Sequence, residues 1–339
     1  MNSGIIISLA YPDTIVKIPD ERFLSYLRYI GIGKKGYVRA GHAALVLIDK
    51  DTGVLEYYDF GRYVSPMSSG RVRSKQTDFE LDFPLRAQIE NNNIKNLDDI
   101  LKFLATNSRL THGEGKLVAS VCKTVNYQKA KAYINTLQEQ YFVKYAVFQK
   151  ETSNCSRFVT ETLIASVTDD RIRKKLIKSK WFTPSTVGNV LLSDTEKRAY
   201  CISEKGDISK FKGSPKSENL RCFLDRLKSY EPNLIGNLHP KSLDMLSSNA
   251  QWLPGIGSGA WFELHNINHA TQYRYRRISP YGTIDVDGIY EISRSGFDTQ
   301  QDYTFCHDSN CLFFKIEQHN VVYKFNYLKV FEGSNLRTP

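Results

Sequence analysis

The spacing of apolar residues changes near residue 200, and this change predicts two parts of different structure. Before it, apolar residues recur every third or fourth position in some stretches, which predicts amphipathic helices. Other stretches are continuously apolar or β-branched, which predicts strands. The predicted helices are 21–33, 97–107, 126–141 and 154–167, and the predicted strands are 4–10, 41–49, 54–63 and 116–125. This mixture predicts an α+β fold for the N-terminal part.

After residue 250 the pattern is that of a mostly β domain. Short runs rich in aromatic and β-branched residues are separated by the turn signals PYG, RSG and DSN. Such runs predict a small antiparallel sheet or barrel. Between the two parts, 201–249 is rich in Ser, Gly and Lys and contains one short amphipathic stretch at 221–230. We therefore expect a domain at 1–200, a linker with short helices at 201–249, and a β domain at 250–339 that binds substrate or a partner.

Length and composition agree with a two-domain globular protein. The 339 residues exceed what one compact core usually holds. A hydrophobic fraction of 41% and a mean hydropathy of −0.40 are ordinary for a globular chain. No apolar run approaches the ~18 residues of a membrane span, and the N-terminus lacks the pattern of a signal peptide, so we expect a cytoplasmic location. Six cysteines are too few for a disulfide scaffold.

The net charge of +10 favours anionic partners, but the basic residues are spread along the chain. The densest run, RIRKKLIKSK at 171–180, is most simply the solvated face of a short helix. QYRYRR at 272–277 interleaves arginines with aromatics, as surfaces that stack nucleic acid bases do. A basic strand on a solvated sheet face explains that segment more simply, and we do not expect a nucleic acid partner.

Cys155 is a candidate nucleophile because it stands at the start of a predicted helix, in the segment ETSNCSRFVTETL. Ser153 or Asn154 can cap this helix, which puts the thiol in the first turn. Unpaired N–H groups and the helix dipole favour a thiolate there. The alternative is a buried structural cysteine, since free cysteine is among the most buried residue types.

A cysteine nucleophile needs a base, usually histidine. His42 opens the predicted strand GHAALVLID, where its side chain shares a face with Ala44 and Val46. A histidine bonded to backbone at a strand edge is the alternative for this residue. His112, in the glycine-containing loop THGEG, is the second candidate base.

Hairpin geometry suggests Asp59 as the group that orients the base. Strands 41–49 and 54–63 flank the turn KDTG, and a turn centred between Asp51 and Thr52 makes His42 face Gly61. Asp59 is then the diagonal neighbour on the same face. A register shift of one residue would put Tyr58 or Phe60 in its place. Alternatively, Asp59 simply begins the turn at DFGRY.

These residues together resemble the circularly permuted papain-like hydrolases, which include permuted NlpC-type enzymes and lecithin:retinol acyltransferase-like proteins. In that group the histidine strand precedes the cysteine helix, as GHAALVLI precedes NCSRFV here. The Asn-Cys-x-x-Phe-Val pattern of the acyltransferase branch matches 154–159. The bacterial Cys-Ser-x-x-Val pattern matches loosely, since Val159 falls one place later. The resemblance covers about residues 1–180 and departs at the third polar residue, where this chain offers Asp59.

The resemblance implies a permuted papain-like fold with an antiparallel sheet and packed helices, and a cysteine hydrolase that needs no cofactor or metal. Cys155 would attack an acyl carbonyl, His42 would act as base, and Asp59 would orient it. The Cys155 N–H, with Tyr58, would stabilise the oxyanion. The substrate would contain an amide or ester, as in a peptide, a cell-wall fragment or a lipid. An acyltransferase and an inactive binding module are the alternatives.

Overall fold

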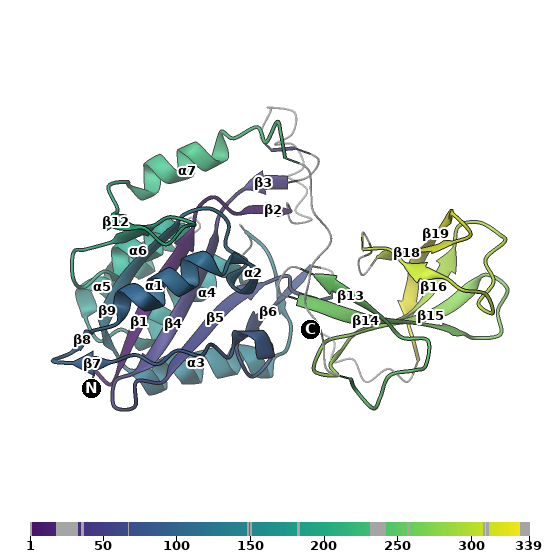
Figure 1. The fold of residues 1–339 in the computed structure, drawn as a ribbon, viewed down its shortest axis with the longest axis horizontal. Coiled ribbons are helices and arrows are strands. Elements are labelled where there is room, and N and C mark those ends of the chain that lie inside the picture. The colour runs from purple at the N-terminus through teal and green to yellow at the C-terminus, as the bar shows by residue number, and fades with distance from the viewer. Residues whose placement is uncertain are drawn as a thin grey trace. The chain divides into compact units, whose positions relative to one another are not determined.

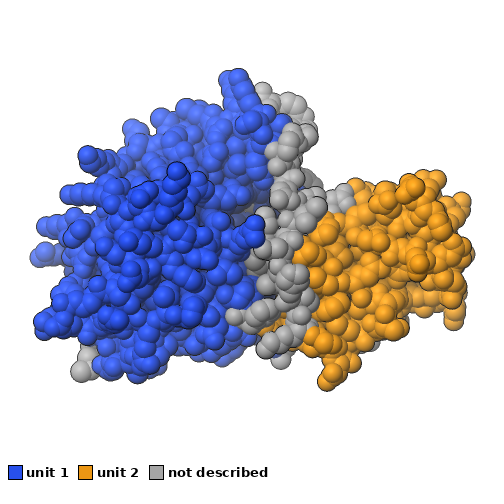
Figure 2. All heavy atoms as spheres, viewed as in Figure 1, with its two compact units in different colours: residues 1–62, 70–231 blue, residues 63–69, 232–339 orange. Residues whose placement is uncertain are grey.

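The computed structural model describes residues 2–17, 33–34, 37–66, 68–147, 149, 151–181, 184–230, 242–255, 258–307, 309 and 312–332. The chain divides into two compact units, which Figure 2 colours separately. Unit 1 consists of residues 1–62 and 70–231, and unit 2 of residues 63–69 and 232–339. The helix predicted at 21–33 lies outside the described residues, apart from its last position.

Unit 1 is built on an eight-stranded sheet whose order is β10-β6-β5-β4-β1-β9-β11-β12 (Figure 1). The strands are β1 (Gly4–Tyr11), β4 (His42–Asp49), β5 (Leu55–Gly61), β6 (Ser69–Arg73), β9 (Leu117–Val125), β10 (Val143–Lys144), β11 (Tyr200–Ile202) and β12 (Ile208–Lys210). The strands from β6 to β12 pair antiparallel. β1 is buried along its whole length, which explains its continuous apolar sequence.

Helices pack against both faces of this sheet. The helices of unit 1 are α1 (Leu97–Thr106), α2 (Ser108–Thr111), α3 (Tyr127–Glu139), α4 (Cys155–Ser166), α5 (Asp170–Ser179), α6 (Thr186–Ser193) and α7 (Pro215–Phe223). On one face, side chains of α3, α4 and α5 form a core with Leu45 and Leu47. On the other face, side chains of α1 form a core with Ile7 and Val46.

Short elements complete unit 1. They are the strand pairs β2 (Ile15–Lys17) with β3 (Tyr37–Arg39) and β7 (Ile89–Glu90) with β8 (Asn93–Ile94), and the 3-10 helix η2 (Phe79–Leu81). The β4–β5 hairpin pairs Ala44 with Asp59. This is the register that follows from a turn centred between Asp51 and Thr52, so the predicted alignment is confirmed.

Unit 2 contains a seven-stranded antiparallel sheet of order β13-β14-β15-β16-β19-β18-β17. Its strands are β13 (Gln251–Gly255), β14 (Ser258–Asn266), β15 (Gln272–Ile278), β16 (Ile284–Ile292), β17 (Thr304–Phe305), β18 (Phe313–Gln318) and β19 (Val321–Val330). The Gln251 side chain links the two end strands, since it donates to the Tyr303 carbonyl at 2.8 Å and accepts from the Phe305 N–H at 3.0 Å. The sheet therefore curls close to a barrel.

The α+β class, with an antiparallel sheet and packed helices in unit 1 and a mostly β unit 2, is confirmed. The helices predicted at 97–107, 126–141 and 154–167 form with ends shifted by at most two residues. Residues 201–230 differ from the linker we expected, because β11 and β12 extend the sheet of unit 1 and a helix forms at Pro215–Phe223. The sequence did not predict β11 and β12, because strands of three residues are too short to show an alternation of apolar and polar residues.

The segment QYRYRR forms β15, and its alternation separates the two residue types. Tyr273 and Tyr275 are buried in the aromatic core of unit 2. Arg274 forms an ion pair with Asp287 at 2.7 Å, and Arg276 with Glu263 at 3.3 Å. The aromatic rings of this segment therefore stabilise the core. Among the described residues, no helix is long and apolar enough to cross a membrane.

Candidate active site

Cys155 is the first residue of α4, and Asn154 fixes the chain just before it. The Asn154 side chain accepts a hydrogen bond from the Arg157 N–H at 2.9 Å, which caps the helix. Its amide nitrogen donates to the Ala146 carbonyl at 3.1 Å. Both ends of the amide are thus engaged, and the thiol lies in the first turn, as predicted from the sequence.

Arg157 fastens the loop that precedes the nucleophile. Its guanidinium donates to the carbonyls of Val147 at 3.1 Å, Gln149 at 3.0 Å and Thr152 at 2.6 Å. A single side chain of the first helical turn thereby satisfies three carbonyls of the entering loop. The loop that enters α4 is consequently held by contacts local in sequence.

His42 is the histidine that the structure brings to Cys155. Cys155 lies close enough to raise the pKa of the His42 imidazole, although the two residues are more than a hundred positions apart in the chain. His42 is buried, and its ring stacks on that of Tyr11 with centroids 6.3 Å apart. His112, the second candidate base, lies at the C-terminal cap of α2 in the left-handed conformation.

Asp59 holds the other side of the imidazole. His42 Nε2 lies 3.2 Å from Asp59 Oδ2, which leaves Nδ1 for the Cys155 thiol. The Tyr57 hydroxyl lies 3.0 Å from the same carboxylate oxygen and 3.1 Å from the Thr111 carbonyl. The structure therefore places Cys155, His42 and Asp59 in one contiguous group.

Arg73 is a member of this group that the sequence analysis did not identify. Its Nε donates to Asp59 Oδ1 at 3.0 Å and its Nη2 to Oδ2 at 2.6 Å. Both side chains are completely buried. Burial opposes ionisation of Asp59, but the charge of Arg73 and the hydrogen bonds from His42 and Arg73 hold the pKa of that carboxyl well below its usual range. Asp59 is thus a fixed negative charge beside the imidazole.

The surroundings of His42 favour its protonated form. Burial alone lowers the pKa of an imidazole. The hydrogen bonds to Asp59 and Cys155, and the negative charge of Asp59, outweigh burial and raise the pKa of His42 to about 9. A protonated imidazole therefore stands next to Cys155.

Glu80 is a buried carboxyl behind this network. Its side chain is 5% exposed and its Oε1 lies 3.9 Å from Arg73 Nη1, and neither carboxyl oxygen accepts a hydrogen bond from a residue that the structure describes. Burial, then the charge of Asp78, raise the pKa of Glu80 to about 7 in spite of Arg73. Glu80 therefore titrates near neutrality next to the cation that holds Asp59.

The loop after α2 closes over the ring that supports His42. A Cβ at Gly113 would lie 2.1 Å from the Tyr11 ring, so only glycine fits there. The Tyr11 hydroxyl donates to the Leu104 carbonyl at 3.2 Å. The Tyr11 ring, which stacks on His42, is thus anchored to α1 by its hydroxyl.

Tyr58, the predicted oxyanion residue, is not part of this group. Adjacent strand residues face opposite sides of a sheet, so Tyr58 points away from the face of Asp59. Its hydroxyl accepts a hydrogen bond from Lys131 of α3, and Lys131 also pairs with Glu56 at 2.7 Å. Burial, together with Glu56, raises the pKa of Tyr58 well above its usual range. Of the two predicted oxyanion donors, the Cys155 N–H alone lies in the group.

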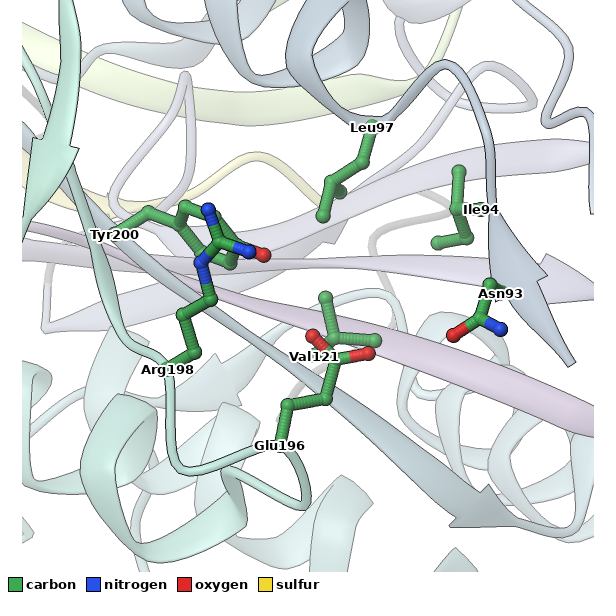
Figure 3. A pocket seen from close by; sticks show the side chains of 7 residues that line it. All are labelled: Asn93, Ile94, Leu97, Val121, Glu196, Arg198 and Tyr200. Atoms are coloured by element: carbon green, nitrogen blue, oxygen red, sulfur yellow. The ribbon is translucent and has the colours of Figure 1, made fainter.

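A hollow elsewhere in unit 1 has a volume of about 430 Å³ and contains none of these residues. Figure 3 shows its apolar wall of Ile94, Leu97 and Val121, with Glu196 and Arg198 at its edge. Lys123 pairs with Glu196 at 2.5 Å, and the Arg198 guanidinium lies over the Tyr200 ring. Across the described part of the chain, no cluster of three or more His, Cys, Asp or Glu side chains is arranged to hold a metal ion.

Comparison with known proteins relates each unit to a different family model. A model described as type VI secretion system effector TseH-like matches residues 6–172, a range that contains His42, Asp59, Arg73 and Cys155. A model described as the DUF6695 C-terminal domain matches residues 250–328. The first match relates the fold of unit 1 to that of the TseH-like effectors.

Among solved structures, the crystal structure of the type VI secretion system effector TseH is similar to this chain. The two share 19% sequence identity, and the alignment covers 62% of this chain and 98% of that one with a TM-score of 0.42. No curated protein matches the sequence.

Proposed function

We propose that unit 1 is a cysteine-dependent hydrolase that cleaves an amide or ester bond. The observation that carries the proposal is that Cys155, in the first turn of α4, lies close enough to His42 to raise the pKa of its imidazole, while Asp59 lies 3.2 Å from Nε2 of the same ring. Asp59 contacts the other side of that imidazole, and Arg73 in turn holds Asp59. Nucleophile, base and orienting group are the three parts that covalent acyl transfer requires.

The reaction begins with attack of the Cys155 thiolate on the substrate carbonyl carbon. A C–S bond forms and the carbonyl oxygen becomes an oxyanion. The Cys155 N–H points out of the helix end, where helical N–H groups lack intrahelical partners, and it donates to this oxygen. Protonated His42 then gives its proton to the leaving amine or alkoxide as the C–N or C–O bond breaks, which leaves a thioester on Cys155.

Hydrolysis of the thioester uses the same residues, but His42 now acts as a base. Neutral His42 takes a proton from water, the hydroxide attacks the thioester carbon, and the C–S bond breaks to release the acid. Asp59 stays ionised throughout, because Arg73 holds its pKa below the usual range. It keeps the ring oriented and stabilises the imidazolium each time it forms.

The proposed biological role follows from the family match. The TseH-like model describes effectors of a type VI secretion system, and we propose that this chain is such an effector. Its place of action would then be outside the cell that makes it, instead of the cytoplasm expected from the N-terminal sequence. Peptides and cell-wall fragments with amide bonds are the substrates we favour.

Thiol alkylation tests the chemical basis of the proposal. With iodoacetamide at pH 7, Cys155 should be labelled at least about tenfold faster than Cys201, and mass spectrometry of the labelled peptides measures both rates. Cys201 is the matched reference, since it is also partly buried but has a raised pKa. Equal labelling rates would contradict the proposal and favour an inactive binding module.

An acyl-type cysteine probe tests catalytic competence. We expect labelling of the full chain and complete loss in Cys155→Ala. His42→Ala should lower the labelling rate about 10²-fold or more, which is the usual contribution of a general base. Cys201→Ala is the matched control and should be labelled like the native chain. A His42→Ala variant that reacts at the native rate would contradict the role given to His42.

A further inference from the structure

Trp181 is exposed in a way unusual for tryptophan. The side chain is 95% exposed, and the residue lies two positions after Ser179, the last residue of α5. Ile177, one helical turn earlier, is 52% exposed. Large apolar side chains at such exposure indicate a surface that contacts another apolar phase when in use.

The two apolar residues share one face with lysines. Lys174, Ile177 and Lys178 follow the spacing of three and four positions that lines up side chains along a helix. Trp181 continues this spacing in the turn after the helix, where its N–H donates to the Lys178 carbonyl. We call these four residues the α5 outer face. The opposite side of the helix is anchored, because Ile172 and Leu176 are buried in the core beneath it.

Most of the basic side chains of α5 have no ion pair within the described part of the chain. Arg171, Lys174, Lys175 and Lys178 form no ion pair with any residue that the structure describes. The neighbouring cations differ: Arg173 pairs with Asp170 at 2.7 Å and Lys180 with Glu161 at 2.5 Å. Four unpaired cations on one short helix make a local positive patch that complements an anionic surface.

We propose that the α5 outer face docks unit 1 on a membrane surface containing anionic phospholipid. Tryptophan is enriched at the level of lipid headgroups, and an amphipathic basic helix binds there through its apolar and cationic side chains together. Lysine stems run alongside the apolar contact while their ammonium groups reach lipid phosphates. A nucleic acid partner would use the cations and the indole ring, but it gives an exposed isoleucine no role.

The helix is built to present this face without rearrangement. Asp169 caps its N-terminus by accepting from the N–H groups of Arg171 and Ile172. The Arg173 side chain donates to the carbonyls of Ile164 and Val167, at the end of α4. Because these anchors do not involve the α5 outer face, substitutions on that face leave the fold intact.

Vesicle binding tests the proposal with the full chain. We expect co-sedimentation with vesicles of equal parts phosphatidylcholine and phosphatidylglycerol, none with pure phosphatidylcholine, and loss of binding at high salt. Trp181 should move into the interface, so tryptophan emission should shift to shorter wavelength on binding. The shift should vanish in Trp181→Phe, since Trp252 and Trp261 pack against each other in unit 2.

Charge reversal supplies the matched comparison. Lys174→Glu with Lys178→Glu should lower vesicle partitioning about tenfold or more. Lys129→Glu with Lys216→Glu changes the net charge equally at exposed sites on α3 and α7, and should have a much smaller effect. Cys155→Ala should bind vesicles like the native chain, so this test is independent of the proposed catalysis.

Two results would overturn the proposal. Equal loss of binding in both double variants would mean that net charge acts without the α5 outer face. The second result is that the chain does not bind vesicles but binds short duplex DNA, and that this DNA binding depends on Lys174, Lys178 and Trp181. That result would assign this face to nucleic acid instead.

Discussion

Arg73 and Asp59 form a bidentate ion pair that is completely buried. The guanidinium meets both carboxylate oxygens, at 3.0 and 2.6 Å, and neither side chain has any exposed surface. The same guanidinium donates to the Leu110 carbonyl at 3.2 Å. This pair connects β5, β6 and α2, and it fixes the charge that faces His42.

Removing the cation should leave Asp59 buried without its counter-charge. We expect Arg73→Met to lower the free energy of unfolding by about 3–5 kcal/mol, as when one partner of a buried ion pair is deleted. Urea denaturation followed by circular dichroism measures this. The control is Lys75→Met, whose exposed pair with Asp82 should contribute at most about 1 kcal/mol. Equal small losses in both variants would contradict the importance of the buried pair.

The raised pKa of His42 predicts a pH dependence of stability. The folded state binds this proton more tightly than the unfolded state, because the pKa rises from 6.5 to about 9. The contribution to stability is therefore fully present below pH 6.5 and lost as pH increases through about 9. Denaturant unfolding between these limits should show a decline in the native chain. His42→Gln should flatten it, and an unchanged decline would contradict the assignment.

The raised pKa of Glu80 predicts a second decline in stability, at lower pH than that of His42. Its pKa is raised from 4.5 to about 7, so the folded state loses stability as pH increases over that range. Replacement by a neutral isostere removes this cost. We expect Glu80→Gln to be about 1–3 kcal/mol more stable than the native chain at pH 8 and equal to it at pH 4.

Chemical denaturation at the two pH values measures this difference for Glu80. The exposed Glu90, which pairs with Lys95 at the surface, supplies the control. Glu90→Gln should change stability little at either pH. A Glu80→Gln variant less stable than the native chain at pH 8 would show that the ionised carboxylate is paired in solution.

Two substitutions of Asn154 should separate its effect on helix stability from its effect on the reactivity of the Cys155 thiol. Asn154→Ala removes the cap and should cost about 0.5–2 kcal/mol of stability. Asn154→Asp can still accept from the Arg157 N–H but adds a negative charge next to Cys155, so alkylation of Cys155 should be slower than in Asn154→Ala. Iodoacetamide rates compared with unfolding curves of both variants test this. Faster alkylation in the aspartate variant would contradict it.

Much of the site was accessible from sequence because it rests on local rules. Asn154 and Cys155 follow helix-start chemistry, and the pairing of Ala44 with Asp59 follows from the position of one turn. The chain also resembles a family in which the histidine strand comes first. These signals needed no knowledge of distant contacts.

Arg73 and the true surroundings of Tyr58 could not be predicted in the same way. β6 has the sequence SGRVR, in which one valine is the only apolar side chain, so it carries no strand pattern. An arginine is expected at the surface, and nothing local indicates its burial against Asp59. The family resemblance implies Tyr58 as an oxyanion donor, whereas the alternation of β5 turns its side chain to Lys131.

The way Arg157 fastens its loop has a consequence for how the protein folds. The hydrogen bonds of the Asn154 and Arg157 side chains to the entering loop span ten residues or fewer, so the start of α4 and this loop can form while the chain is still open. Contact with His42 closes a loop of more than a hundred residues and is entropically the slower event. During refolding, the rise of Cys155 thiol reactivity should therefore report the docking of α4 on the sheet, later than the formation of α4 itself.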